Sequence, residues 1–205
     1  KELQRKFINP ELCDITEALV YTEPYNDERG RNRVFPPIAD FVKEKLYEDQ
    51  GLHCEVAKLK MDFMTRAQSL IHGDLHTGSI FINEESTKVF DPEFCFYGPM
   101  GYDIGNVIAN MIFAWANGDA AGAADFCKWV EDVLVDVINM TKEKMEKYYD
   151  EHVTDTMCRN ELYKKYYMDT IIEDTSAVAG LELIRRIVGM ANVKDITTIA
   201  DEAKR

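Results

Sequence analysis

Apolar side chains recur every three or four residues along most of this chain, which is the spacing of one buried helix face. The sequence Asn9-Pro10 is typical of a helix start, and Gly189 is typical of a helix end. In chain order, the expected helices cover residues 9–19, 36–51, 54–70, 103–115, 126–140, 155–174, 176–188 and 195–204. The pattern therefore predicts a mostly helical protein.

The period changes in one segment. Residues 79–83 and 87–90 are short runs rich in β-type residues on either side of a polar turn, which predicts a β-hairpin. No other segment has a convincing strand pattern, so we expect this hairpin to be the only β-structure. The expected fold class is α+β, mostly helical, and the polar loops of the hairpin are the expected site.

Composition narrows the class of protein. The 205 residues are 46% hydrophobic, enough for one packed core. With 37 acidic and 24 basic residues the net charge is -13, which does not favour nucleic-acid or anionic membrane partners. Five widely spaced cysteines without a C-x-x-C pair predict reduced thiols, and no apolar run reaches the roughly 18 residues of a membrane span. We expect a cytoplasmic protein.

Two carboxylates flank the predicted hairpin. Asp74 lies in the loop that enters it, and Asp91 follows its second strand, so strand pairing should bring both to one end. Glu93 is near enough to join them. Phosphoryl transfer needs an acid at the attacking hydroxyl and carboxylates that hold Mg²⁺ against the phosphates. The hairpin therefore predicts a site for phosphoryl transfer that holds Mg²⁺.

The order of these residues matters more than any one of them. His72-Gly73-Asp74 (the HGD loop), Ser79 five residues after the aspartate, and Asp91 after a strand parallel the kinase catalytic loop and its later metal-binding aspartate. The plainer alternative is a polar β-turn with capping aspartates.

Histidine spacing suggests a second enzyme class. His72 and His76 flank Asp74 as in metallohydrolases that bind two metal ions. Such sites need several further histidines, and the chain has only His53 and His152 besides these two. A kinase remains the favoured reading.

Residues 8–118 resemble the 5-methylthioribose kinase family, within the wider aminoglycoside phosphotransferase and choline kinase group. The segments that carry the resemblance are residues 9–13, 72–80, 91–94 and 97–101. In the wider group the position of Ser79 is usually an asparagine that binds magnesium. The serine fits the narrower family, and whether it contacts the metal stays open.

The resemblance implies roles for the candidate residues. Asp74 would be the catalytic base toward the anomeric hydroxyl of 5-methylthioribose, giving the sugar 1-phosphate in methionine salvage. Asp91 and Glu93, with Ser79 as a further candidate ligand, would hold Mg²⁺ against the ATP phosphates. ATP and 5-methylthioribose would be the partners of a possible homodimer.

The arginine pair Arg185 and Arg186 has two readings. The resemblance implies that it reaches the substrate pocket, where it would donate to sugar hydroxyls or to the phosphoryl group. The residue pattern alone also allows pairing with Glu182 on the helix surface. His76 is a further candidate for the sugar pocket.

Three residues are candidates for structural support. Asp103 has two compatible readings: the pattern predicts that it caps the next helix, and the resemblance implies that it also accepts hydrogen bonds from the HGD-loop backbone. We expect His72 and Gly73 to shape this loop rather than to move protons.

The domain expectation is that residues 1–205 form the C-terminal catalytic lobe of a kinase-like phosphotransferase. A complete kinase also needs a β-rich lobe with a glycine-rich loop and a strand lysine, and the chain has neither motif. Two explanations follow from this absence. The chain is part of a longer enzyme and is inactive alone, or it is a single-lobe homologue that binds a sugar or a partner without catalysis. We favour the former because Asp74, Asp91 and Glu93 are intact; a kinase for another small hydroxylated substrate is a further alternative.

Overall fold

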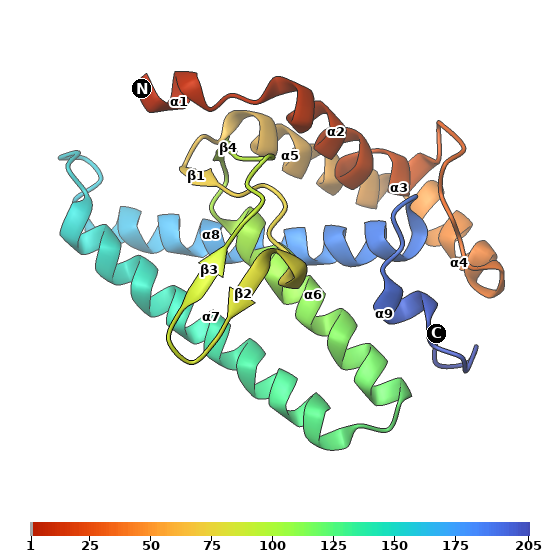
Figure 1. Cartoon of the computed structure of the whole chain (residues 1–205). Helices are drawn as coiled ribbons and strands as arrows, with labels where there is room; N and C mark the ends of the chain where they lie inside the picture. The colour runs from red at the N-terminus through yellow and green to blue at the C-terminus, as the bar shows by residue number, and fades with distance from the viewer. Residues whose placement is uncertain (1) are drawn as a thin grey trace.

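The computed structural model describes residues 2–205, which form long helices around two small β-ladders (Figure 1). The helices are α1 (Glu2–Lys6), α2 (Pro10–Tyr21), α3 (Glu23–Asn26), α4 (Ala39–Val42), α5 (Gln50–Thr65), α6 (Gly101–Ala120), α7 (Ala124–His152), α8 (Glu161–Val188) and α9 (Lys194–Thr197). The strands are β1 (Ser69–Ile71), β2 (Ile80–Ile82), β3 (Thr87–Val89) and β4 (Phe96–Gly98). Figure 1 shows α8 crossing the molecule, with α2 and α5 on one side and α6 and α7 on the other. The mostly helical α+β class expected from the sequence is confirmed.

The hydrophobic core joins α2, α5, α6 and α8 to the strands. Phe63 lies at its centre, with its ring centroid 5.2 Å from that of Tyr21, 4.8 Å from that of Phe96 and 5.1 Å from that of Tyr102. Such aromatic pairs contribute about 0.5–1.5 kcal/mol each beyond the area that they bury. Since Phe96 belongs to β4, the core fixes the ladder that leads into the HGD loop.

Two glycines let α6 approach α8 closely. A Cβ atom on Gly101 would lie 2.6 Å from the Thr175 backbone nitrogen, and one on Gly105 would lie 2.7 Å from the Thr175 carbonyl oxygen. No side chain fits between the two backbones at these positions. The contact fixes the first turns of α6, which carry Asp103.

The predicted hairpin is confirmed, with Ile80 paired to Val89 in an antiparallel β2–β3 ladder. The expectation that it is the only β-structure was wrong, because β1 and β4 form a second ladder that pairs Ile71 with Phe96. Strands of three residues are too short to show alternation, so their pairing depends on the buried core beneath them.

Two helix boundaries differ from the predictions. The helix expected over residues 54–70 is α5, which ends at Thr65, so Leu70 lies in β1. The two helices expected over residues 155–188 are the single helix α8, whose end before Gly189 is confirmed. The polar stretch inside α8 does not interrupt the helix, and the hydroxyl of Thr175 is satisfied there by the carbonyl oxygen four residues earlier (2.8 Å).

The helix expected over residues 36–51 is also interrupted. It comprises a 3-10 turn (Pro36–Ile38), α4 and a π-helical turn (Lys43–Tyr47). It ends there because Asp49 caps α5 by accepting from the Leu52 N–H (2.9 Å). The last expected helix is reduced to the short α9, whereas α2, α6 and α7 confirm the remaining predictions. Within residues 2–205, no helix has both the length and the apolar character needed to cross a membrane.

Candidate active site

The HGD loop connects β1 to the hairpin and requires a glycine at its centre. Gly73 has a φ of +84°, and a Cβ atom there would overlap the carbonyl oxygen of Phe94. The close approach brings the segment after Asp91 against the loop. Gly73 therefore shapes this part of the site.

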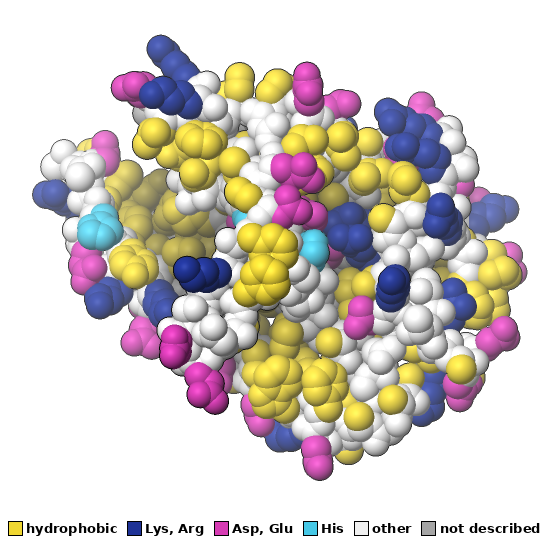
Figure 2. Space-filling view, viewed as in Figure 1, with side chains coloured by type: hydrophobic (Ala, Val, Ile, Leu, Met, Phe, Trp, Pro, Cys, Tyr) yellow, Lys and Arg dark blue, Asp and Glu magenta, His cyan; other side chains and the backbone are white. Residues whose placement is uncertain are grey.

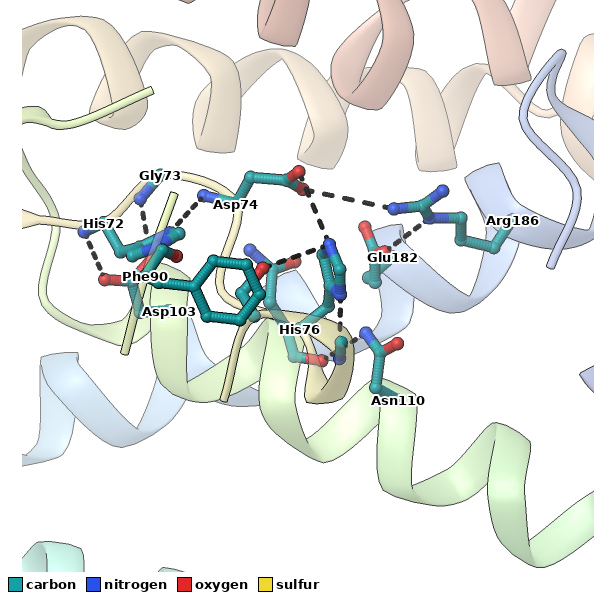
Figure 3. A network of polar contacts seen from close by, with 12 residues as sticks. His72, Gly73, Asp74, His76, Phe90, Asp103, Asn110, Glu182 and Arg186 are labelled. Carbon is teal, nitrogen blue, oxygen red and sulfur yellow. Dashed lines mark hydrogen bonds and ion pairs between the residues drawn. The ribbon is translucent and has the colours of Figure 1, made fainter. Parts of the chain in front are cut away.

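Asp103 holds the loop from α6 (Figure 3). Its Oδ2 accepts from the His72 backbone N–H at 2.6 Å and its Oδ1 accepts from the Gly73 N–H at 3.0 Å. Burial raises the pKa of this carboxyl group, and the two hydrogen bonds partly offset that effect. Of the two compatible readings of Asp103, the helix cap was wrong, because the N-cap of α6 is Met100, without a side-chain cap, while the structure does show Asp103 bonded to the loop.

His72 ties the loop to the end of β3. Its Nδ1 faces the Asp74 N–H at 3.4 Å, and its Nε2 lies 2.9 Å from the Phe90 carbonyl oxygen. If Nδ1 accepts, Nε2 carries the proton and donates it to Phe90. The Phe90 N–H in turn donates to the Ser79 carbonyl (3.1 Å). Phe90, the residue before Asp91, is therefore bonded to His72 through its carbonyl and to Ser79 through its N–H.

The arginine pair of α8 faces Asp74, whose carboxylate is partly exposed. Asp74 Oδ1 lies 3.7 Å from Arg185 Nη2 and 4.0 Å from Arg186 Nη2, the second of which is seen in Figure 3. Its Oδ2 lies 3.8 Å from His76 Nε2. Segments more than a hundred residues apart in sequence thus meet at one carboxylate, where three groups surround the candidate base.

Glu182 holds the arginine pair through buried contacts within α8, and it was missed as a candidate site residue in the sequence. It is 1% exposed and accepts from Arg185 Nε and Nη2, the latter at 3.0 Å, and from Arg186 Nε at 2.9 Å. The proposed pairing on the helix surface was therefore wrong in its location, since the contact is buried and both arginines also face Asp74. Burial alone would lower the pKa of Arg185, but Glu182 raises it, so the guanidinium stays charged.

His76 and Ser79 lie on the hairpin side of Asp74. His76 Nδ1 accepts from the Gly78 N–H (3.0 Å), which leaves Nε2 to face Ser79 Oγ at 3.3 Å. Ser79 is buried. A direct contact between its hydroxyl and a metal ion stays a prediction.

Asp91 and Glu93 are both exposed and lie in the segment that follows β3. In the part of the chain that the structure describes, no three His, Cys, Asp or Glu side chains form a ready metal-binding group. Two carboxylates nevertheless fit Mg²⁺, which keeps several waters and takes further oxygen ligands from substrate phosphates. The carboxylates of Asp91 and Glu93 therefore suit a Mg²⁺ site whose remaining ligands are water and the substrate phosphates.

Asn9 connects α2 to this metal-binding segment. Its side-chain amide donates to the carbonyl oxygens of Glu93 (2.7 Å) and Cys95 (3.2 Å), and its backbone is left-handed with a φ of 39°. Asn9 is the N-cap of α2, as predicted, yet its side chain does not cap the helix. Its contacts run to residues more than eighty positions away, and no local pattern indicates them.

A cavity of about 180 Å³ opens beside Asp74 and the arginine pair. Ile15 and other residues of α2 also line it. A larger cavity of about 410 Å³ between α7 and α8 has no acidic or basic residue other than a histidine in its lining, so it lacks the groups that phosphoryl transfer needs. The smaller cavity is therefore the candidate substrate pocket.

Known proteins match this chain along its length. It is 38% identical to methylthioribose kinase 1 of Oryza sativa subsp. japonica over 96% of this chain and 49% of that protein. It is 37% identical to the methylthioribose kinase of Bacillus pumilus (strain SAFR-032) and 34% identical to that of Escherichia coli O45:K1 (strain S88 / ExPEC), over 100% of this chain and 50% and 52% of those proteins. The chain thus spans about half the length of the curated relatives it matches. Residues 8–134 match the phosphotransferase enzyme family, and the chain belongs to that family.

Proposed function

We propose that the protein containing this chain is a small-molecule kinase that transfers the γ-phosphoryl group of ATP to the anomeric hydroxyl of 5-methylthioribose. The observation that carries the proposal is the meeting of Asp74, on a loop clamped by Asp103, with Arg185 and Arg186 of α8. The relatives named methylthioribose kinase support this sugar as the substrate.

Asp74 would orient the anomeric hydroxyl and accept its proton as the new bond to phosphorus forms. Its partial exposure leaves the carboxylate open to the cavity. The two arginines would donate to the sugar hydroxyls or to the phosphoryl group in transit. With one charge of the pair balanced by Glu182, one net positive charge remains to face Asp74 and an anionic phosphoryl group.

Asp91 and Glu93 would hold Mg²⁺, and Ser79 is a further candidate ligand. When bound, the metal ion would supply positive charge that offsets the negative charge developing during phosphoryl transfer. The chain supports this placement by bonding Phe90, the neighbour of Asp91, to His72 and Ser79. His76, between Asp74 and Ser79, does not line the cavity of about 180 Å³, and a contact of its ring with the sugar stays a prediction.

We further infer that the chain is the C-terminal lobe of a two-lobed kinase. Its relatives are about twice as long, and the hairpin exposes apolar side chains that a second lobe would cover, including Phe81 (64% exposed) and Ile82 (75% exposed). Figure 2 shows hydrophobic side chains at the surface over this part of the molecule. A homodimer, a cytoplasmic location and the absence of a nucleic-acid partner stay predictions.

The test is a magnesium-dependent ATP-consumption assay on the full-length protein with 5-methylthioribose, ribose and an aminoglycoside. We expect turnover with 5-methylthioribose alone. An Asp74→Asn variant should lose about 10²- to 10⁴-fold in kcat, the range that a positioned base contributes. Near-normal turnover by this variant would contradict the assignment of the base, and sugar binding without turnover by the wild type would favour the non-catalytic alternative.

A further inference from the structure

The larger cavity, between α7 and α8, takes no part in the proposed reaction. It shares no lining residue with the cavity beside Asp74. Its volume of about 410 Å³ lies within the roughly 300–1,000 Å³ of small-molecule pockets. Figure 2 shows the surface hollowed beside the C-terminal end of α7, with hydrophobic side chains deep in the hollow. The cavity is therefore large enough for a small ligand and can be reached from the surface.

The lining of this cavity is aromatic and uncharged. Tyr148 and Tyr149 of α7 and Tyr163 and Tyr167 of α8 line it, together with three methionines. Within residues 2–205, no Asp, Glu, Lys or Arg side chain belongs to the lining, and His152 is its only side chain that can carry a positive charge. A charged ligand would leave water here without meeting an opposite charge, which costs free energy. The lining therefore favours an uncharged ligand.

Four of the rings form two near-parallel pairs, one on each helix. The centroids of Tyr148 and His152 on α7 lie 6.0 Å apart with 15° between the ring planes, and those of Tyr163 and Tyr167 on α8 lie 6.1 Å apart with 19°. Because the two rings of a pair share nearly one orientation, a planar ring that packs well against one meets the other in the same geometry. A compact quaternary ammonium ion, which aromatic rings also attract, gains nothing from this alignment. The pairs therefore favour a planar aromatic ligand.

Hydrogen bonds hold the edge of the cavity in place before any ligand binds. The Tyr149 hydroxyl donates to the Cys158 carbonyl (2.6 Å), and Asp155 Oδ1 accepts from the Cys158 N–H (3.2 Å). Lys164 Nζ donates to Asp150 Oδ2 at 2.7 Å and joins α8 to α7. A cavity that is already ordered costs less conformational entropy to fill. The aromatic lining is thus presented in a fixed arrangement.

We propose that the cavity between α7 and α8 is a binding site for an uncharged, planar aromatic or heteroaromatic small molecule of the size of a fused ring pair. The ring system packs against the tyrosines of both helices, and the methionines supply sulfur contacts at its edges. His152 offers a ring nitrogen to one polar group of the ligand. The site lies apart from the substrate cavity, so the inference does not depend on the reaction.

The test measures binding of 2-naphthol to the full-length protein by isothermal titration calorimetry, with decahydro-2-naphthol as the saturated, non-planar analogue. Saturating ADP and Mg²⁺ are present throughout, so that the probe does not occupy a nucleotide site. We expect a dissociation constant of about 1 mM or below for 2-naphthol, which a fragment of this size can reach. The saturated analogue should bind about three- to tenfold more weakly because it loses ring stacking. Tetraethylammonium and 2-naphthoate, which are charged, should each bind at least about tenfold more weakly.

Tyr148→Ser and Tyr163→Ser each remove one ring of a pair, and Tyr166→Ser is the matched control. Tyr148 is 55% exposed and Tyr163 is 37% exposed, so neither replacement should unfold the protein, which circular dichroism checks. Each should weaken 2-naphthol binding by about threefold or more. Tyr166 lies on the same helix as Tyr163, is 61% exposed and does not line the cavity, so its replacement should leave the affinity unchanged.

Four results would overturn the inference. Absence of 2-naphthol binding would show that the rest of the full-length protein fills the cavity or that no ligand of this class enters it. Unchanged affinity in both folded cavity variants would place the bound ligand elsewhere. Equal or tighter binding of the saturated analogue would remove the preference for planar rings, and tighter binding of tetraethylammonium would make the cavity a site for organic cations.

Discussion

At the scale of residues, the site depends on a buried ion-pair network more than on any single motif. Glu182 anchors Arg185 and Arg186, and both arginines face Asp74 at 3.7–4.0 Å. We expect Glu182→Gln to raise the KM for the sugar and to lower the free energy of unfolding by up to about 3–5 kcal/mol, because it leaves a buried positive charge unpaired. Steady-state kinetics and urea unfolding measure the two effects.

Glu173→Gln is the control for that experiment, since Glu173 is exposed on the same helix. It should change neither quantity appreciably. If Glu182→Gln lowers stability while KM and kcat stay normal, Glu182 is a structural residue and does not position the arginines. Partial recovery of KM in Glu182→Asp, which keeps the charge, would further support positioning.

How far these residues could be predicted depends on the range of their contacts. The HGD loop and Asp91 could be predicted because their spacing is local and follows a chemical requirement. The position of Glu182 three and four residues before the arginines was visible, but its burial was not, since burial depends on the elements packed against α8, among them α2 and α6. The contacts of Asn9 could not be predicted at all from local pattern, because its hydrogen-bond partners lie in a segment distant in sequence.

At the scale of elements, the position of Asp103 depends on the close contact of α6 with α8. A Gly105→Ala variant would place a Cβ atom 2.7 Å from the Thr175 carbonyl oxygen and 2.9 Å from the Ala179 nitrogen. We expect it to lower the free energy of unfolding by about 1–3 kcal/mol through overpacking, although alanine favours a helix interior by about 1 kcal/mol. Kcat should fall as well, because a shift of α6 moves the carboxylate that clamps the HGD loop.

Gly180→Ala is a matched control, because a Cβ atom on this α8 glycine meets open space. It should raise the free energy of unfolding by about 0.5–1 kcal/mol. Urea unfolding of both variants gives the comparison, and a stabilised Gly105→Ala variant would show that the two backbones separate without cost.

Elements with a clear period were predicted well, and elements set by tertiary contacts were not. The apolar stripes of α2 and α6 and the β-type residues around the polar turn of the hairpin are local signals. The β1–β4 ladder has none, and its residues were assigned in part to a helix because Leu70 continued the spacing of α5 by coincidence. The continuity of α8 was also not predicted, since its polar residues Asp174 and Thr175 are buried by tertiary contacts.

At the scale of the whole molecule, the hairpin combines the candidate metal-binding segment with an exposed apolar surface. Phe81 and Phe90 stack with ring centroids 4.4 Å apart, and Phe81 is 64% exposed. A paired aromatic surface of this kind beside a polar site is typical of an interface. We therefore expect the isolated chain to show negligible ATP turnover and to bind a hydrophobic fluorescent dye that the full-length protein binds weakly.

Substitution at the hairpin locates that dye-binding surface. Phe81→Ser should reduce dye binding by the isolated chain. Trp129→Ser, on the exposed face of α7, should leave the difference in dye binding between the isolated chain and the full-length protein unchanged. In the full-length protein, Phe81→Ser should lower the unfolding temperature, because a covered aromatic contact is lost. Equal dye binding by both forms would mean that no second lobe covers the hairpin. Full turnover by the isolated chain would mean that residues 1–205 contain everything the reaction needs.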